Sequence, residues 1–190
     1  MSCHRINSVF GKTTNYKLAQ HAKFAKEFEI QQSMISINIT INYKEILKRI
    51  YTESGYIAQA RSSIGLSSEL SEMMSATEED KRILDNAFCS ACKDLGAVIT
   101  RYISECDIEF VKNSQNDEIE ECVEAFTVPN NFPITIKAIL KQSFEDFITF
   151  YMLQQWMLIT KPDEANIYAI KLQGETIRIR EMLASRKRPI

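Results

Sequence analysis

The hydrophobic positions near the start of the chain follow a period of two. Between residues 35 and 41 every second residue is an isoleucine and the residues between them are polar. This alternation predicts a strand with one buried face. The isoleucines of that face are Ile35, Ile37, Ile39 and Ile41. A helix is expected to follow from about Tyr43 to Ser62, and residues 63–76 are interpreted as a loop.

A second helix is clearly marked at its start. Thr77 can cap it, and the acidic residues that follow place negative charge at the positive end of the helix dipole. Apolar residues then recur at steps of four and three as far as about Glu105. They form a stripe that requires a facing partner along its whole length. The stripe consists of Leu84, Phe88, Ala91, Leu95, Val98 and Tyr102.

Two further strands and a long apolar helix are predicted next. The strands Asp107–Val111 and Ile119–Val128 are expected to form a hairpin that is acidic on one side. Pro133 then suits the first turn of a helix that runs from about Ile134 to Ile159. This helix is apolar on nearly every side, so we expect it to be buried centrally or covered by a partner.

The last helix begins at Pro162 and leads to a basic C-terminus. Only 5 Gly and 4 Pro occur in 190 residues, which favours long helices over a β fold with many turns. We therefore predict a mainly α fold for residues 34–190. It is a four-helix bundle-like domain with a small antiparallel β element, made of the hairpin and the N-terminal strand.

Residues 1–33 differ from the rest of the chain. They hold both histidines, His4 and His21, and more basic than acidic residues. A short helix from about Tyr16 to Ile30 is one expectation. We interpret the segment either as an arm that grips a neighbouring subunit or as a simple extension. Met34 stands directly before the strand pattern and could be the true translation start.

Charge is unevenly distributed, although the net charge is only -2. Residues 105–124 are strongly acidic and the C-terminus is basic, an asymmetry that can steer association between copies. The basic tail admits three interpretations: an ordinary solvated end, a contact with the acidic hairpin of a neighbouring copy, or a contact with DNA phosphates. The candidate DNA-facing residues are Arg178, Arg186, Lys187 and Arg188.

The cysteines and the apolar runs indicate the compartment. The 5 cysteines are an odd number, and no secretory signal is visible, which favours reduced thiols in a cytosol-like environment. No apolar run reaches about 18 residues, so no membrane span is predicted.

The only motif with metal-ligand character is Cys89-x-x-Cys92. A zinc site would need two more ligands, for which Cys106 and Cys122 are the candidates. Because the pair lies within a helix stripe, we favour cysteines that act as small hydrophobic residues. The acidic hairpin residues could in principle hold a divalent cation, but a solvated or interface face is the commoner outcome.

Catalysis is hard to build from this sequence. Residues 34–190 contain no histidine, which removes Ser–His and Cys–His schemes, and no Gly-rich phosphate loop is present. Glu145 and Asp146 are adjacent, so on a helix they point about 100° apart and do not pair. We predict no enzyme activity, no catalytic residue, no cofactor and no metal.

The order of these segments resembles a known group of proteins. An Ile/Thr strand precedes a helix with Tyr43, Gly55 and Tyr56. The Thr77–Lys81 helix start, the acidic strand pair and the aromatic helix with Trp156 follow. The last helix opens Pro162-Asp163-Glu164-Ala165 and ends Arg186-Lys187-Arg188-Pro189. Over residues 34–190 this resembles small structural proteins of tailed phages and prophages of Bacteroidota, and in layout the helical head–tail connector (adaptor) proteins.

The resemblance implies a subunit of a virion neck, assembled in the host cytoplasm. It would form a homo-oligomeric ring, for which a dodecamer is one arrangement. The ring would lie between the portal protein and the tail proteins and would surround packaged DNA. No membrane partner is implied. A tail-terminator or tail-completion ring is the nearest alternative, and a small cytosolic DNA-binding or regulatory module belongs to a different class. The expected subunit contacts are Ile35, Ile37, Ile39, Ile41, Glu118, Glu120, Glu124, Trp156, Arg186, Lys187 and Arg188.

Overall fold

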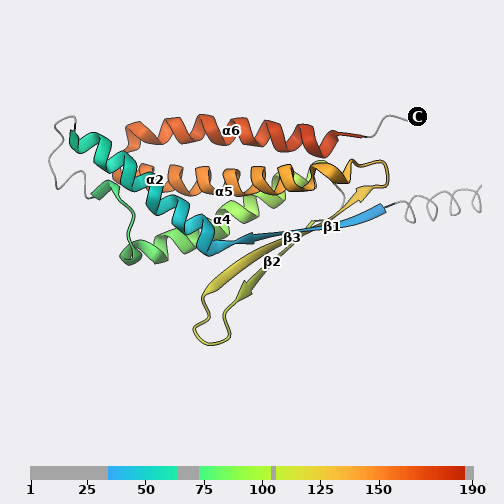
Figure 1. Cartoon of the computed structure of the whole chain (residues 1–190), viewed down its shortest axis with the longest axis horizontal. Coiled ribbons are helices and arrows are strands. Elements are labelled where there is room, and N and C mark those ends of the chain that lie inside the picture. Colours follow the sequence, from blue (N-terminus) through green and yellow to red (C-terminus); the bar gives the residue numbers. More distant parts are fainter. Residues whose placement is uncertain (1–33, 64–72, 104–105, 187–190) are drawn as a thin grey trace, which may run out of the picture. The chain divides into compact units, whose positions relative to one another are not determined.

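The helices of this protein lie around a central one, α5 (Figure 1). The computed structural model describes residues 34–63, 73–103 and 106–186. The elements are β1 (Met34–Asn42), α2 (Tyr43–Ser63), η1 (Glu78–Asp80), α4 (Lys81–Thr100), β2 (Cys106–Lys112), β3 (Ile119–Pro129), η2 (Ile134–Ile136), α5 (Lys137–Thr160) and α6 (Pro162–Ala184). The expected mainly helical fold with a small antiparallel β element is confirmed.

The three strands form one sheet in the order β1-β3-β2. Strands β2 and β3 are antiparallel, with Ile108 opposite Glu124 and Phe110 opposite Cys122. The inner face of the sheet packs on the helices: the Phe110 ring lies 6.4 Å from that of Phe88 on α4. The long first strand therefore finds its partner within the chain, in the predicted hairpin.

Helix α5 is covered by α6 on one side and by α2 and α4 on the other (Figure 1). Its middle turns are buried on several sides, through Phe144, Phe147, Ile148, Met152, Leu153, Trp156 and Met157. Ile139, Leu158 and Ile159, near the two ends of the helix, are exposed. Phe144 on α5 contacts Phe126 on β3, with 6.2 Å between ring centroids, so the sheet belongs to the same core.

Element boundaries differ from expectation at helix starts and at the end of α4, which lies at Thr100 instead of near Glu105. The first turns at Glu78 and Ile134 are 3-10 helix. At the first of them, the backbone N–H and the hydroxyl of Thr77 both donate to Asp80 Oδ2 at 2.9 Å. Met73 and Met74, which we expected in a loop, are helical. The expected arm or extension, residues 1–33, lies outside the described residues. Among those described, no helix has the length and apolar character needed to cross a membrane.

Candidate functional site

The isoleucines proposed as subunit contacts lie in the protein's own core. Ile37, Ile39 and Ile41 are buried and Ile35 is half-buried. Because β1 lays its apolar face on the helices of its own chain, the fold of one chain does not favour contact between these side chains and a neighbour, and that contact stays a prediction. Within the described part of the chain, β3 pairs with one side of β1, and the other edge of β1 has no strand beside it.

The acidic hairpin residues divide between two faces of the sheet. Glu118 is exposed and forms an ion pair with Lys81 of the same chain, which lowers the pKa of Glu118. Glu120 accepts a hydrogen bond from Asn113 Nδ2 at 2.9 Å. Glu124 is buried within its own chain, which does not favour the predicted contact with a neighbouring subunit, and that contact stays a prediction.

Trp156 is also an internal residue. Its side chain is buried and its Nε1–H donates to the backbone oxygen of Met74 at 2.9 Å. Because this tryptophan is covered by its own chain, the structure of one chain does not favour its contact with a neighbouring subunit, which stays a prediction. The helices of one chain suffice to cover this part of α5.

Among the basic residues, Arg178 is exposed and lies 3.6 Å from the Glu175 carboxylate. Arg186 donates to the backbone oxygens of Leu183 and Ser185 at 2.7 Å, so it closes the end of α6. Lys187 and Arg188 lie outside the described residues. Their proposed contacts with a neighbour or with DNA stay predictions.

A different apolar surface is exposed, on the side of α6 that faces away from the core. Its residues are spaced three, four and three apart, which places them on one face of the helix. We call them the outer stripe of α6: Ile167, Ile170, Gly174 and Ile177. The isoleucines are at least half exposed, and Ile170 is 70% exposed. Apart from its own helix backbone and its two chain neighbours, no heavy atom of the described residues lies within 4 Å of the position that a Cβ of Gly174 would take.

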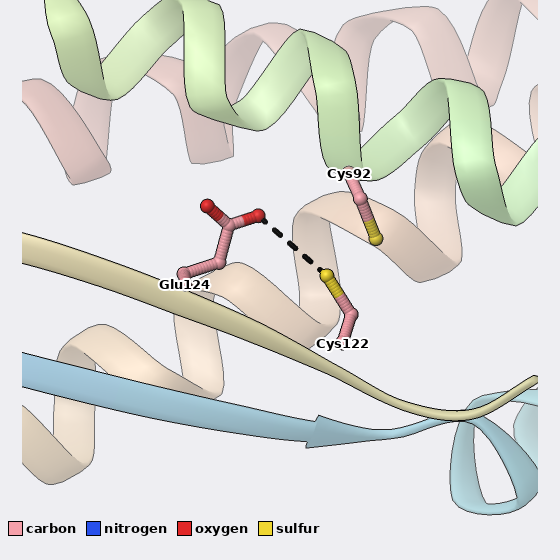
Figure 2. Close-up of side chains that lie close together, drawn as sticks. All are labelled: Cys92, Cys122 and Glu124. Atoms are coloured by element: carbon pink, nitrogen blue, oxygen red, sulfur yellow. Dashed lines mark hydrogen bonds between the residues drawn. The ribbon is translucent and has the colours of Figure 1, made fainter. Parts of the chain in front are cut away.

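A cluster of thiols and one carboxyl group lies between the sheet and α4. Cys92 comes from α4, while Cys122 and Glu124 come from alternate positions of β3 and therefore share one face of the strand (Figure 2). The sulfur atoms of the two cysteines and a Glu124 carboxylate oxygen all lie within 4.8 Å of one another. All three side chains are buried.

Hydrogen bonds in the cluster come from sulfur. The Cys122 thiol donates to Glu124 Oε1 at 3.9 Å, and the Cys106 thiol donates to Glu124 Oε2 at 3.5 Å. Helix α4 approaches the sheet closely here, because a Cβ on Gly96 would lie 2.4 Å from Ile108 Cδ1. Glycine at this position therefore lets the helix lie close to strand β2 beside the cluster.

Burial controls the protonation of these groups. It raises the pKa of Glu124 to about 7, although the thiol hydrogen bonds partly oppose the shift. It also raises the pKa of Cys106 to about 12, with a further contribution from the nearby Glu124 charge. The pKa of Cys92 is raised by its hydrogen bond with Cys122 and by burial. Without a cation, the cluster is therefore held close to electrically neutral.

The sequence pointed to part of this cluster. Cys106 and Cys122 are the candidate partners of Cys92 that the sequence suggests, whereas the acidic run around Glu124 predicts a surface acid. The alternation along the strand could have located Glu124. Cys122, Glu124, Phe126 and Val128 are two residues apart and therefore share one face of the strand, and the apolar residues Phe126 and Val128 indicate that this face is buried. Comparison of the chain with protein-family models, with curated proteins and with solved structures finds no match.

Proposed function

We propose that this chain is a structural subunit that assembles with copies of itself into a ring, in the manner of a phage head–tail connector. The outer stripe of α6 is the observation that carries the self-assembly. The order of the segments, which resembles that of phage structural proteins, supports the particular setting at a virion neck.

The argument from α6 concerns its two faces. The inner face is buried through Ala165, Tyr168, Ile179 and Leu183. A helix at the edge of a monomer is normally polar on its opposite face, whereas α6 presents three isoleucines there. A contiguous exposed apolar row favours contact with another protein surface. Gly174 in the middle of the row would let a second helix approach closely.

Charge gives such an assembly a preferred direction. The hairpin presents acidic residues, including Glu109 and Glu121, while the last turns of α6 and the tail are basic. Opposite charges on different parts of one subunit suit a head-to-tail contact, which closes into a ring when the rotation allows it. The portal and tail proteins as neighbours rest on the resemblance alone.

The test measures the mass of the protein in solution by light scattering after size-exclusion chromatography. Wild-type protein should form a species larger than the monomer, and Ile170→Asp should shift it to monomer because the charge falls within the stripe. The matched control is Tyr56→Asp, which adds the same charge at an exposed aromatic residue of α2 and should leave the assembly intact.

A strictly monomeric wild-type protein that binds duplex DNA tightly, with a steep loss of affinity as salt rises, would replace the ring by a DNA-binding module. A larger species that Ile170→Asp leaves unchanged would remove α6 from the interface. Imaging of the assembled particle would separate a connector from a tail-completion ring, because the two occupy different levels of the neck.

A further inference from the structure

The feature that the proposed assembly leaves unused is the cluster of Cys92, Cys122 and Glu124 (Figure 2). It is the one group of at least three potential metal ligands with mutually close ligand atoms that the described residues contain. Its members come from two elements that are distant in sequence, α4 and β3, and they meet only because the chain folds.

Glu124 is unusual because it is a buried acid whose hydrogen-bond partners are thiols. The other buried acid in the described chain, Glu145, forms ion pairs with Arg49 and Lys141. Thiols are weak donors and do not neutralise a carboxylate. Buried charges in proteins are normally paired or bound to metal ions, so an ionised Glu124 at this position would require a cation.

The kind of cation follows from the ligand atoms. Thiolates are soft ligands that select zinc and related transition metals, whereas calcium and magnesium require oxygen ligands. Ligand atoms of a tetrahedral zinc ion lie about 3.5–4 Å apart, given zinc–sulfur bonds of about 2.3 Å. The mutual distances in this cluster, within 4.8 Å, need only a small contraction to reach that geometry.

We propose that Cys92, Cys122 and Glu124 bind a zinc ion, with Cys106 as the fourth ligand. The Cys106 sulfur, on the adjacent strand β2, lies 3.5 Å from the second carboxylate oxygen but outside the group of mutually close ligand atoms, so its side chain would have to move inward to complete the site. Binding releases the thiol protons to solvent, and the divalent ion then compensates the charges of the thiolates and the carboxylate.

The role of this ion is structural. Cys92, Cys122 and Glu124 are buried and Cys106 is half-buried, so four protein ligands would close the site, as is typical of zinc sites that stabilise a fold. It links α4 to both strands of the hairpin across the interface that Gly96 keeps narrow. The inference does not depend on the proposed ring, since every ligand belongs to one chain.

The alternative is a core of neutral thiols around a protonated carboxyl group. The two states differ in metal content, which elemental analysis of the purified full-length protein measures directly. We expect about one zinc ion per chain after expression with added zinc. Replacement of zinc by Co²⁺ should give the thiolate-to-cobalt charge-transfer band and the intense visible bands of a tetrahedral site.

Substitutions assign the ligands. Cys122→Ser and the isosteric Glu124→Gln should each weaken metal binding at least about tenfold in competition with a chelator. Cys89→Ser is the matched control, because Cys89 lies on the same helix as Cys92 but outside the cluster, and it should bind zinc as the wild-type protein does. The cobalt spectrum of the wild-type protein tests the site even where a variant fails to fold.

Three results would overturn the proposal. One is wild-type protein that contains no zinc and gives no cobalt spectrum. Another is zinc that stays bound at full affinity in folded Cys122→Ser or Glu124→Gln protein. The third is a disulfide between Cys92 and Cys122 in protein purified without reductant, because it would consume two of the ligands.

Discussion

Among single residues, Arg49 on α2 has the clearest structural role. Its guanidinium donates to Glu145 Oε2 at 3.0 Å and to Asp146 Oδ1 at 3.2 Å. We expected these two adjacent acids to point apart on their helix. The two terminal nitrogens of the Arg49 guanidinium nevertheless reach one acid each. The side chain of Glu145 is 8% exposed and that of Arg49 is 38% exposed. The arginine therefore stays partly in solvent while it compensates the charge of a buried carboxylate.

Replacing this arginine should therefore destabilise the fold. We expect Arg49→Ala to lower the free energy of unfolding by about 1–3 kcal/mol, since Glu145 loses its closest cation while buried. Urea unfolding followed by circular dichroism measures this. Lys112→Ala, which removes an ion pair with the exposed Asp117, should change it by less than about 0.5 kcal/mol. Equal losses in the two variants would contradict the assigned role of Arg49.

Tyr43 makes stability depend on alkaline pH. The residue is buried and its hydroxyl donates to Asp85. Burial, and secondly the hydrogen bond and charge of Asp85, raise the pKa of Tyr43 well above its ordinary value near 10. Above pH 10 the unfolded chain therefore loses this proton while the folded chain keeps it, so stability falls as pH rises.

The share of Tyr43 in this fall can be isolated by substitution. In Tyr43→Phe the decline of the unfolding free energy between about pH 10 and 12 should be shallower by up to about 1.4 kcal/mol per pH unit. Urea unfolding at a series of pH values measures the slope. Tyr56→Phe removes an exposed tyrosine and should keep the wild-type slope. A Tyr43→Phe slope equal to that of the wild type would show that other groups cause the decline.

The central element is α5, whose residues decide whether the core forms. We expect Trp156→Ala to cost about 3–5 kcal/mol of stability, because it leaves a large cavity and an unpaired carbonyl at Met74. Thermal unfolding measures the loss. Ile159→Ala lies one turn further along the same helix at a 62% exposed position and should change stability by less than about 0.5 kcal/mol. A mild effect of Trp156→Ala on folding, with loss of assembly, would reinstate this tryptophan as an interface residue.

The elements were predictable from the sequence wherever one period dominated. The isoleucine alternation of β1 and the apolar stripe of α4 placed both elements to within a few residues. Strand β3 was harder because it has polar residues on both faces, and the inward position of Glu124 depends on contact with α4. The coverage of α5 also needed the structure, since sequence does not show how completely three helices enclose a fourth.

In the whole molecule, we propose two stabilising interactions, one for the folded chain and one for the assembly of several chains. The zinc ion would act within one chain, between α4 and the hairpin. The outer stripe of α6 would act between chains. Neither can be read from local periodicity: the ligands meet only in the folded chain, and the stripe is recognised as unpaired only once the inner face of α6 has been located.

These two contributions respond differently to protein concentration. Association couples stability to concentration, so the melting temperature of the wild-type protein should rise as the protein is concentrated, and that of Ile170→Asp should stay constant. Removal of zinc by a chelator should lower the melting temperature of both proteins, because the ion binds a single chain. Its contribution is about 2.7 kcal/mol when free zinc is a hundredfold above its dissociation constant. Scanning calorimetry over a range of protein concentrations, with and without chelator, separates the two effects. A chelator effect confined to the assembled wild-type protein would place the ion between subunits instead.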